Sequence, residues 1–223
     1  MPADKSLFYY GRLYHRLFDP SLAPARRLAL DLIPLESTVL DLACGTGQLC
    51  IALRAAKKCR VTGVDLSLRM LDFATLANSF DNVTFRHGDA TDLTNMPDAS
   101  FDYATVVLLL HELPRESRGQ VVREGLRVAR HLLLIDAQAP LPRNAEGLGI
   151  RLVEATFGHE HYHHFRDFLA LGGLMTAVQD AKLATTVEHQ SVFLHGCREA
   201  VMLRKTGTAH DRLVHHKPPG RRP

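Results

Sequence analysis

The sequence has few cysteines, and their spacing is not that of metal ligands. Cys44, Cys50, Cys59 and Cys197 form no CxxC pair and no metal-finger pattern, so a zinc-finger fold is not predicted. The first residues show no secretory signal peptide, which leaves no reason to expect disulfides. We therefore expect a reducing compartment and a cytoplasmic location.

Long apolar runs are also missing. The longest, near Ala104 to Leu110, has the length of a strand and falls well short of the roughly 20 residues that a membrane helix needs. We expect no transmembrane segment, while peripheral membrane contact through an amphipathic N-terminal helix stays open as an alternative.

The body of the chain lacks an excess of positive charge. The formal net charge is +3, and the segment from Arg204 to Pro223 alone holds six basic residues against one acidic residue. The rest of the chain is therefore slightly acidic, whereas nucleic-acid binders usually carry their basic excess on the folded domain. We expect no nucleic-acid partner, and we interpret residues 205–223 as a flexible basic tail.

The sequence does contain enough apolar material for one domain with a full core. Hydrophobic residues make up 46% of the 223 residues, and charged residues make up 23%. From residue 37 onward, short and almost wholly apolar segments alternate with helical patterns, which is typical of a parallel sheet covered on both faces. We predict an α/β, doubly wound, Rossmann-like fold in three layers. We expect a helical N-terminal cap (1–36), a main domain (37–204) with a helical lid insertion (about 143–182), and the tail.

The segment VLDLACGTGQLC, from Val39 to Cys50, has the pattern of a turn that a ligand approaches closely. Gly45 and Gly47 can adopt backbone angles that other residues avoid, and they lack the Cβ that would obstruct a ligand. A helix expected to begin near Gly47 would point its free N–H groups at the same position.

Acids after two later strands support a nucleoside ligand. Asp65 ends the second predicted strand, where a carboxylate can accept hydrogen bonds from both ribose hydroxyls. Ser67, just beyond it, is a suitable N-cap for the next helix. Asp89 and Ala90 end the third predicted strand at the same edge, where an acid could accept from an adenine amino group.

The pattern departs from the dinucleotide-binding fingerprint at two positions. Cys50 stands where that fingerprint has a third glycine, and Asp41 lies inside the first strand. A carboxylate near a pyrophosphate would repel it, whereas a sulfonium with an amino-acid tail would attract the carboxylate. Electrostatics therefore favours S-adenosylmethionine over NAD.

Five segments resemble, in order and spacing, the motifs of the class I S-adenosylmethionine-dependent methyltransferases. They are VLDLACGTG, VTGVDLS, HGDATDL, FDYATVVLLLHELP and HLLLIDA. The most similar group includes the ubiquinone/menaquinone-biosynthesis methyltransferases, with methyltransferase domains of types 11 and 25. The resemblance extends from about Phe8 to Asp136, and it implies S-adenosylmethionine as cofactor. It also implies a seven-stranded sheet whose last two strands form an antiparallel hairpin, which suits Ala184 to Arg204.

The resemblance implies a role for each matched position. The methionine part of the cofactor would lie among Asp41, Ala43, Gly45 and Gly47, and Asp65 would hold the ribose. Tyr10 and Tyr14 are candidates for covering the cofactor, with packing in an amphipathic helix as an equal alternative. The full set of further expected cofactor contacts is Leu66, Met70, Asp89, Ala90, Val107, Leu108 and Tyr14.

No side chain is an unambiguous catalyst. In-line methyl transfer gains much of its acceleration from positioning, and a base is needed only where the acceptor must lose a proton. His111 and Glu112, in the LLLHELP segment after the fourth strand, are the catalytic candidates. Shaping of this loop is the alternative role.

Histidines gather in the segment GHEHYHHF. His159 and His163 would share one face of a helix, and so would Glu160 and His164. The HExxH order is missing and no third ligand can be identified, so we predict no metal. A solvated helix face is the favoured interpretation, and substrate contact or a metal pair are the alternatives.

Together these patterns favour an S-adenosylmethionine-dependent methyltransferase that acts on a small organic acceptor. One alternative is an inactive S-adenosylmethionine-binding regulatory or partner protein. Another is an enzyme similar to phosphatidylethanolamine N-methyltransferases. The sequence specifies neither the acceptor nor the oligomeric state.

Overall fold

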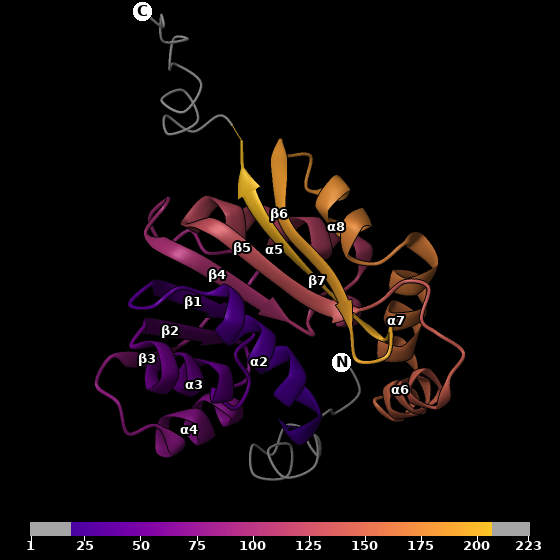
Figure 1. Ribbon diagram of the computed structural model, residues 1–223, viewed down its shortest axis with the longest axis horizontal. Coiled ribbons are helices and arrows are strands. Elements are labelled where there is room, and N and C mark those ends of the chain that lie inside the picture. The colour runs from indigo at the N-terminus through magenta and orange to yellow at the C-terminus, as the bar shows by residue number, and fades with distance from the viewer. Residues whose placement is uncertain (1–18, 207–223) are drawn as a thin grey trace, which may run out of the picture.

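The computed structural model describes residues 19–206 and shows a seven-stranded sheet between two layers of helices (Figure 1). The strands are β1 (Thr38–Leu42), β2 (Arg60–Asp65), β3 (Val83–His87), β4 (Phe101–Val107), β5 (Ala129–Ala137), β6 (Thr185–Phe193) and β7 (Arg198–Lys205). Their order is β3-β2-β1-β4-β5-β7-β6. The first five strands run parallel, and β7 is antiparallel to both β5 and β6. The predicted doubly wound α/β fold and its closing hairpin are confirmed.

Helices connect the strands and cover both faces of the sheet. They are α2 (Ala23–Leu32), α3 (Gln48–Lys57), α4 (Leu68–Ala77), α5 (Arg115–Val128), α6 (Ala145–Thr156), α7 (His159–Leu171), α8 (Leu174–Asp180) and the short 3-10 turns η2 (Asp19–Leu22) and η3 (Leu110–Glu112). One face is covered by α2, α3 and α4, and the other by α5 and α8 (Figure 1). Between β5 and β6 the chain forms α6, α7 and α8, within the range predicted to be a helical insertion.

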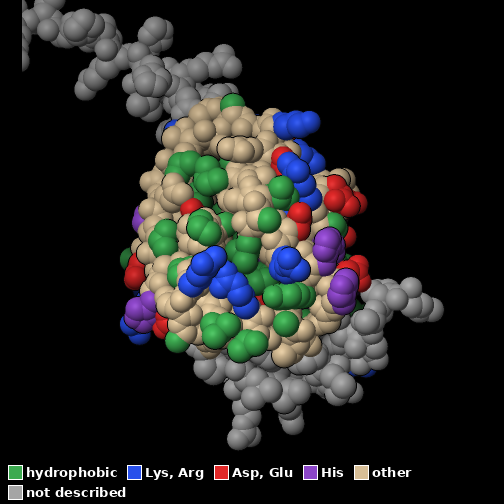
Figure 2. Space-filling model, turned by 90° about the vertical axis from the view of Figure 1, so that its right-hand side faces the viewer, with side chains coloured by type: hydrophobic (Ala, Val, Ile, Leu, Met, Phe, Trp, Pro, Cys, Tyr) green, Lys and Arg blue, Asp and Glu red, His purple; other side chains and the backbone are tan. Residues whose placement is uncertain are grey.

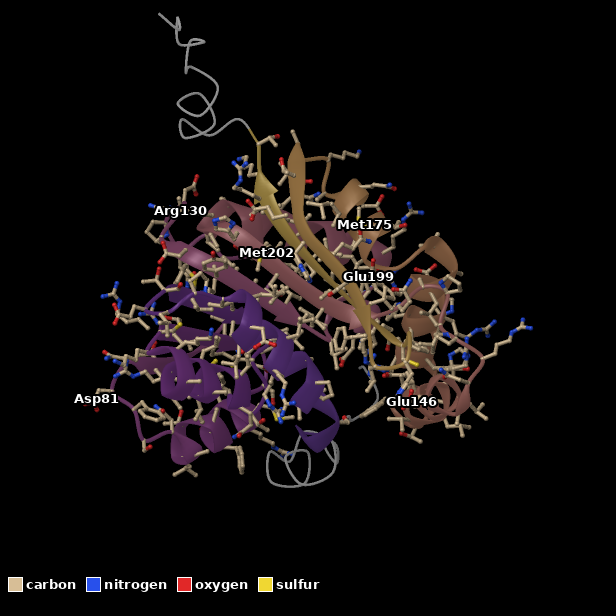
Figure 3. The ribbon with its side chains drawn as sticks, viewed as in Figure 1. Asp81, Arg130, Glu146, Met175, Glu199 and Met202 are labelled. Atoms are coloured by element: carbon tan, nitrogen blue, oxygen red, sulfur yellow. The ribbon has the colours of Figure 1, made fainter. Side chains whose placement is uncertain are left out.

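Strand β5 explains why the sheet needs two helical layers. Leu132 and Leu134 pack in the core on the side of α5, α7 and α8, while Leu133 and Ile135 pack in the core on the side of α2 and α3. All four side chains are fully buried. Met202 of β7 joins the second core, and Figure 3 shows its position on that strand. A strand buried on both faces reads as a continuous apolar run, as HLLLIDA does.

Two local features fix where elements begin and end. Ser67 is the N-cap of α4, as predicted, because its Oγ accepts a hydrogen bond from Met70 N at 3.3 Å. Strand β4 ends at Val107, before the end of the apolar segment, because Leu108 has a φ of 56°. The predicted positions Tyr10 and Tyr14 and nearly all of the tail lie outside the described residues.

The face that carries α6 and α7 exposes hydrophobic and basic side chains together (Figure 2). On α6, Leu148, Leu152 and Val153 are exposed. A shallow groove of about 530 Å³ beside this helix is lined by Arg143, Asn144, Ala145, Leu148 and Arg151. None of the helices between residues 19 and 206 combines the length and the hydropathy that a bilayer-crossing segment requires.

Replacing Leu133 with Ala should lower the free energy of unfolding by about 2–5 kcal/mol, because a fully buried side chain leaves a cavity in the core. Leu76 provides the matched control. It lies on α4 and is 85% exposed, so Leu76→Ala should change the stability by less than about 0.5 kcal/mol. Urea unfolding followed by circular dichroism measures both, and equal losses would contradict the position of β5 between two cores.

Candidate functional site

The turn after β1 is tied to the end of β2 at the carboxyl edge of the sheet. Gly45 N donates a hydrogen bond to Asp65 Oδ2 at 2.8 Å, and Ser67 N donates to Asp65 Oδ1 at 2.8 Å. Burial raises the pKa of the Asp65 carboxyl, although both N–H groups favour its charged form. The sequence predicted that Asp65 lies at this edge, and the structure adds that its carboxylate holds the glycine turn in place.

The two glycines of the turn are required for different reasons. Their φ angles are both positive, at 53° for Gly45 and 73° for Gly47. Among residues 19–206, a Cβ on Gly45 would meet no atom within 4 Å, so the described part of the chain leaves the turn open on that side. A Cβ on Gly47 would lie 2.5 Å from the ring of Phe85 and 2.9 Å from the Cβ of Ala74. Gly47 therefore serves packing at the start of α3, and Gly45 leaves room for a ligand.

Asp41 is a buried acid directly before this turn. Its side chain accepts a hydrogen bond from Thr105 Oγ1 at 2.6 Å, and a second one from Cys50 Sγ at 3.3 Å. Burial raises the pKa of Asp41 to about 6, against the two hydrogen bonds that lower it. Asp41 is only 3% exposed, so its charge rather than direct contact is what a ligand at the turn would meet.

The residues predicted beside the adenine differ in exposure. Leu66 is 62% exposed, whereas Met70 is 2% exposed, so only Leu66 presents its side chain to a ligand. Asp89 is exposed, and its Oδ1 accepts from Thr91 N at 2.8 Å and from Thr91 Oγ1 at 2.7 Å. Ala90 beside it is nearly buried.

The end of β4 lies next to the glycine turn. In the register of the two strands, Val106 pairs with Leu42, the last residue of β1. Val107 and Leu108 follow and are partly exposed, and Leu108 N donates to Ile135 O at 2.8 Å. The positions predicted to lie under the reacting part of the ligand thus border the same edge as Gly45, on its β4 side.

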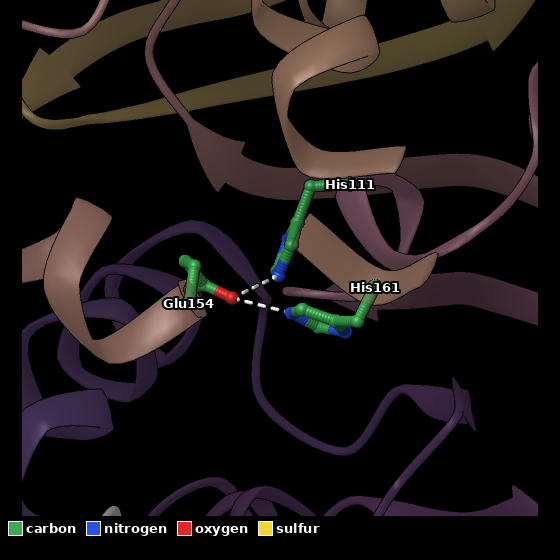
Figure 4. Close-up of side chains that lie close together, drawn as sticks. All are labelled: His111, Glu154 and His161. Carbon is green, nitrogen blue, oxygen red and sulfur yellow. Dashed lines mark hydrogen bonds and ion pairs between the residues drawn. The ribbon is translucent and has the colours of Figure 1, made fainter. Parts of the chain in front are cut away.

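His111, a predicted catalytic residue, is buried in a histidine–carboxylate cluster formed by His111, Asp136, Glu154 and His161. His111 Nδ1 lies 2.6 Å from Asp136 Oδ1, and its Nε2 lies 3.5 Å from Glu154 Oε2. His161 Nε2 lies 2.6 Å from the same Glu154 oxygen (Figure 4). Burial lowers the pKa of His111, but Asp136 and Glu154 outweigh burial and raise this pKa above its ordinary value. The other candidate, Glu112, is 32% exposed, with its Oε2 3.9 Å from His161 Nδ1.

The histidine-rich helix divides between two environments. His159 and His163 are exposed, and His164 Nε2 lies 4.0 Å from Glu160 Oε1. These four residues fit the predicted solvated face. His161, which the sequence analysis paired with no other residue, is buried and joins the cluster instead.

The sequence analysis did not identify Asp136, Glu154 or Thr105 as site residues. Asp136 had a signal, because it is an acid near the carboxyl end of a buried apolar strand, as Asp65 is. Glu154 is one acid on an ordinary helix, and Thr105 is a β-branched residue in a strand. Neither feature distinguishes Glu154 or Thr105 from a residue with a purely structural role.

Residues 39–131 match the model of a family described as a methyltransferase domain. The chain is 32% identical over 158 residues to the 27-O-demethylrifamycin SV methyltransferase of Amycolatopsis mediterranei (strain S699), covering 63% of this chain and 57% of that protein. It is 36% identical over 85 residues to a demethylmenaquinone methyltransferase of Bacillus licheniformis, covering 37% of this chain and 36% of that one. The crystal structure of an S-adenosylmethionine dependent methyltransferase from Mesorhizobium loti shares the fold, with a TM-score of 0.58 and 22% identity over 83% of this chain and 98% of that chain.

Residues 39–131 carry a methyltransferase domain. The family match and the strand order both support this assignment, and they confirm the resemblance found in the sequence. The chain spans 57% and 36% of the lengths of the two curated relatives.

The methyltransferase domain fits S-adenosylmethionine, the cofactor of its family. The open side of Gly45 lets a ligand approach the turn. Each Asp65 oxygen accepts one N–H and retains a second acceptor site for a ribose hydroxyl. Leu66 offers exposed apolar surface to a base, and the buried charge of Asp41 suits a sulfonium.

Gly47→Ala should destabilise the ligand-free protein more than Gly45→Ala does. Both substitutions place a Cβ at positive φ, which costs about 1–2 kcal/mol. The Cβ introduced by Gly47→Ala would also overlap Phe85 and Ala74, adding about 1–3 kcal/mol. Urea unfolding of both variants measures the difference, and equal losses would mean that Phe85 moves aside without cost.

Asp41→Asn should stabilise the ligand-free protein at neutral pH, because it keeps an acceptor for Thr105 and removes a buried charge. Folding raises the pKa of Asp41 from 3.8 to about 6, so the folded state binds the proton more tightly. The wild type should therefore lose stability as the pH rises through this window, and the variant should gain up to about 3 kcal/mol above it. Denaturant unfolding across this pH range measures both, and parallel profiles would rule out the raised pKa.

Proposed function

We propose that the chain is an S-adenosylmethionine-dependent methyltransferase that acts on a small organic acceptor. The observation that supports it most is the open glycine turn held by Asp65 at the carboxyl edge, within a domain of the methyltransferase family. The names of the rifamycin and menaquinone relatives describe small-molecule acceptors, which supports the same class of acceptor for this chain.

In this proposal, residues on two strand ends hold the cofactor. When bound, S-adenosylmethionine supplies a methyl group on a positively charged sulfur. Asp65 accepts hydrogen bonds from the ribose hydroxyls, while the N–H groups of Gly45 and Ser67 keep its carboxylate oriented. Leu66 packs against the base, and Asp89 contacts the base edge.

Asp41 provides charge rather than direct contact. Its carboxylate lies in a site almost free of water, where a negative charge acts more strongly on a nearby cation than it would in solvent. Thr105 and Cys50 hold its orientation through hydrogen bonds. A ligand cation above the turn would offset the cost of burying this acid.

The acceptor is expected on the β4 side of the turn. Val107 and Leu108 are partly exposed there, and the loop that follows carries His111 and Glu112. His111 is buried and its Nδ1 is held by Asp136, so we assign it the shaping of this loop. Glu112 is the catalytic candidate with an accessible side chain, and it would act only on an acceptor that must lose a proton.

Asp65→Ala should weaken S-adenosylmethionine binding by about 1–3 kcal/mol, because it removes a charged acceptor from the ribose site. Titration calorimetry measures the affinity. Asp72, an exposed acid on α4, provides a control with the same change in charge, and Asp72→Ala should bind like the wild type. An unchanged affinity in Asp65→Ala would contradict the ribose role.

A methyl-release assay with phenol, quinol, amine and lipid acceptors, phosphatidylethanolamine included, tests the transfer itself. Methylation of one of these acceptors is the expected result. Tight S-adenosylmethionine binding without transfer to any of them would instead indicate a cofactor-binding regulatory protein. Binding of NAD in preference to S-adenosylmethionine would overturn the proposal.

A further inference from the structure

The histidine–carboxylate cluster brings together three side chains of the types that bind transition metals. His111, Glu154 and His161 each offer one ligand atom, these three atoms all lie within 4.8 Å of one another, and all three residues are buried. We propose that these three atoms bind one divalent transition-metal ion, and that Zn²⁺ is the ion that fits best. Two imidazole nitrogens and one carboxylate oxygen form a common zinc ligand set, whereas Mg²⁺ and Ca²⁺ prefer oxygen ligands.

One of the two separations from Glu154 Oε2 matches a tetrahedral zinc site, and the other is shorter. Zinc bonds of about 2.0–2.2 Å place two ligand atoms about 3.3 Å apart. His111 Nε2 and Glu154 Oε2 lie 3.5 Å apart, which matches this separation. His161 Nε2 and Glu154 Oε2 are at a hydrogen-bond distance of 2.6 Å. A metal ion would replace the proton that His161 Nε2 and Glu154 Oε2 share. The distance between these two atoms would then increase by less than about 1 Å.

His111 is hydrogen-bonded to a carboxylate through its other ring nitrogen, as is usual for metal-bound histidines. Asp136 Oδ1 lies 2.6 Å from His111 Nδ1, so this nitrogen keeps its proton and Nε2 faces the cluster. A metal ion would bind Nε2 in place of a proton. Ala137 N fixes Asp136 by donating to the same oxygen at 2.7 Å. His161 Nδ1 is buried without a hydrogen-bond partner in the described part of the chain. Glu112 Oε2, at 3.9 Å, is placed to become the second such carboxylate.

The surroundings of the cluster suit a bound ion. Asp136 and Glu154 are two acids almost completely removed from water, and each lies 2.6 Å from a histidine nitrogen that can bind or orient a metal ligand. The ring of Phe165 lies 5.7 Å from that of His111 and helps to exclude water. The guanidinium of Arg118 on the same side is already paired with Asp167 at 2.9 Å.

A metal ion here would join η3 to the consecutive helices α6 and α7, which lie far from η3 in the sequence. It would fix the loop after β4 against the helices that follow β5. The inference does not depend on the proposed methyl transfer, because metal binding is measured directly. Its failure would leave the proposed function untouched.

The test uses the whole chain, freed of metal with a chelator and then titrated with Zn²⁺ or Co²⁺. We expect one tightly bound Zn²⁺ per chain and a rise of several degrees in the melting temperature, because an ion that binds only the folded state stabilises it. Bound Co²⁺ should give the strong visible absorption of a four- or five-coordinate ion. A weak, six-coordinate Co²⁺ spectrum in the wild type would overturn the proposal without the need for any variant.

Variants separate metal binding from packing. His161→Gln keeps an N–H donor for Glu154 but removes the imidazole, so we expect at least a tenfold loss of Zn²⁺ affinity and no strong Co²⁺ absorption. Asp136→Asn should lose about 10- to 100-fold in affinity. His163→Gln, at an exposed position on the same helix, should bind Zn²⁺ like the wild type. Equal Zn²⁺ affinity in His161→Gln and His163→Gln would refute the site.

Discussion

The hydrogen bond from Gly45 N to the Asp65 carboxylate is the contact on which the candidate site depends. It joins two elements separated by 20 residues, and it sets the direction of the turn relative to the end of β2. Ser67 N holds the second oxygen, so the carboxylate is oriented before any ligand arrives. The fold has therefore ordered both oxygens already. A ligand that hydrogen-bonds to them does not incur that entropy cost on binding.

Much of the fold follows from local patterns, because the central strands, such as β1 and β5, are buried on both faces. Leu132 to Ile135 form a continuous apolar run. Between helical segments, such a run is typical of a strand in a sheet that helices cover on both faces. The end of β4 could not be predicted in this way. The apolar sequence continues to Leu110, but Leu108 turns to a positive φ where its N–H bonds to Ile135, a residue distant in the sequence.

The candidate site could be predicted only at positions where the residue type itself indicates its structural or chemical role. Glycines at positive φ and an acid at a strand end carry such signals, so Gly45, Gly47 and Asp65 could be identified from the sequence. The histidine–carboxylate cluster could not, because four histidines on one helix look alike until packing separates them. The one available signal was that His161 lies four residues before Phe165, which makes it part of the buried stripe of α7.

Buried acids collect along one edge of the sheet, and folding alone gives no reason for them. Asp41, Asp136 and Glu199 lie near the ends of β1, β5 and β7, all at the edge that carries the glycine turn, and each is at most 5% exposed (Glu199 is labelled in Figure 3). Apolar residues of similar size at such positions are commonly neutral or stabilising, because they remove the cost of taking a charge out of water. The rest of the strands follows that rule, with leucine, valine and isoleucine in both cores. The acids at this edge are therefore best explained by what binds there. The buried charge of Asp41 is costly while the edge is empty and becomes favourable when a sulfonium lies above the glycine turn. Asp136 is already paired with His111, so a metal ion between His111 and His161 would bind next to an existing ion pair.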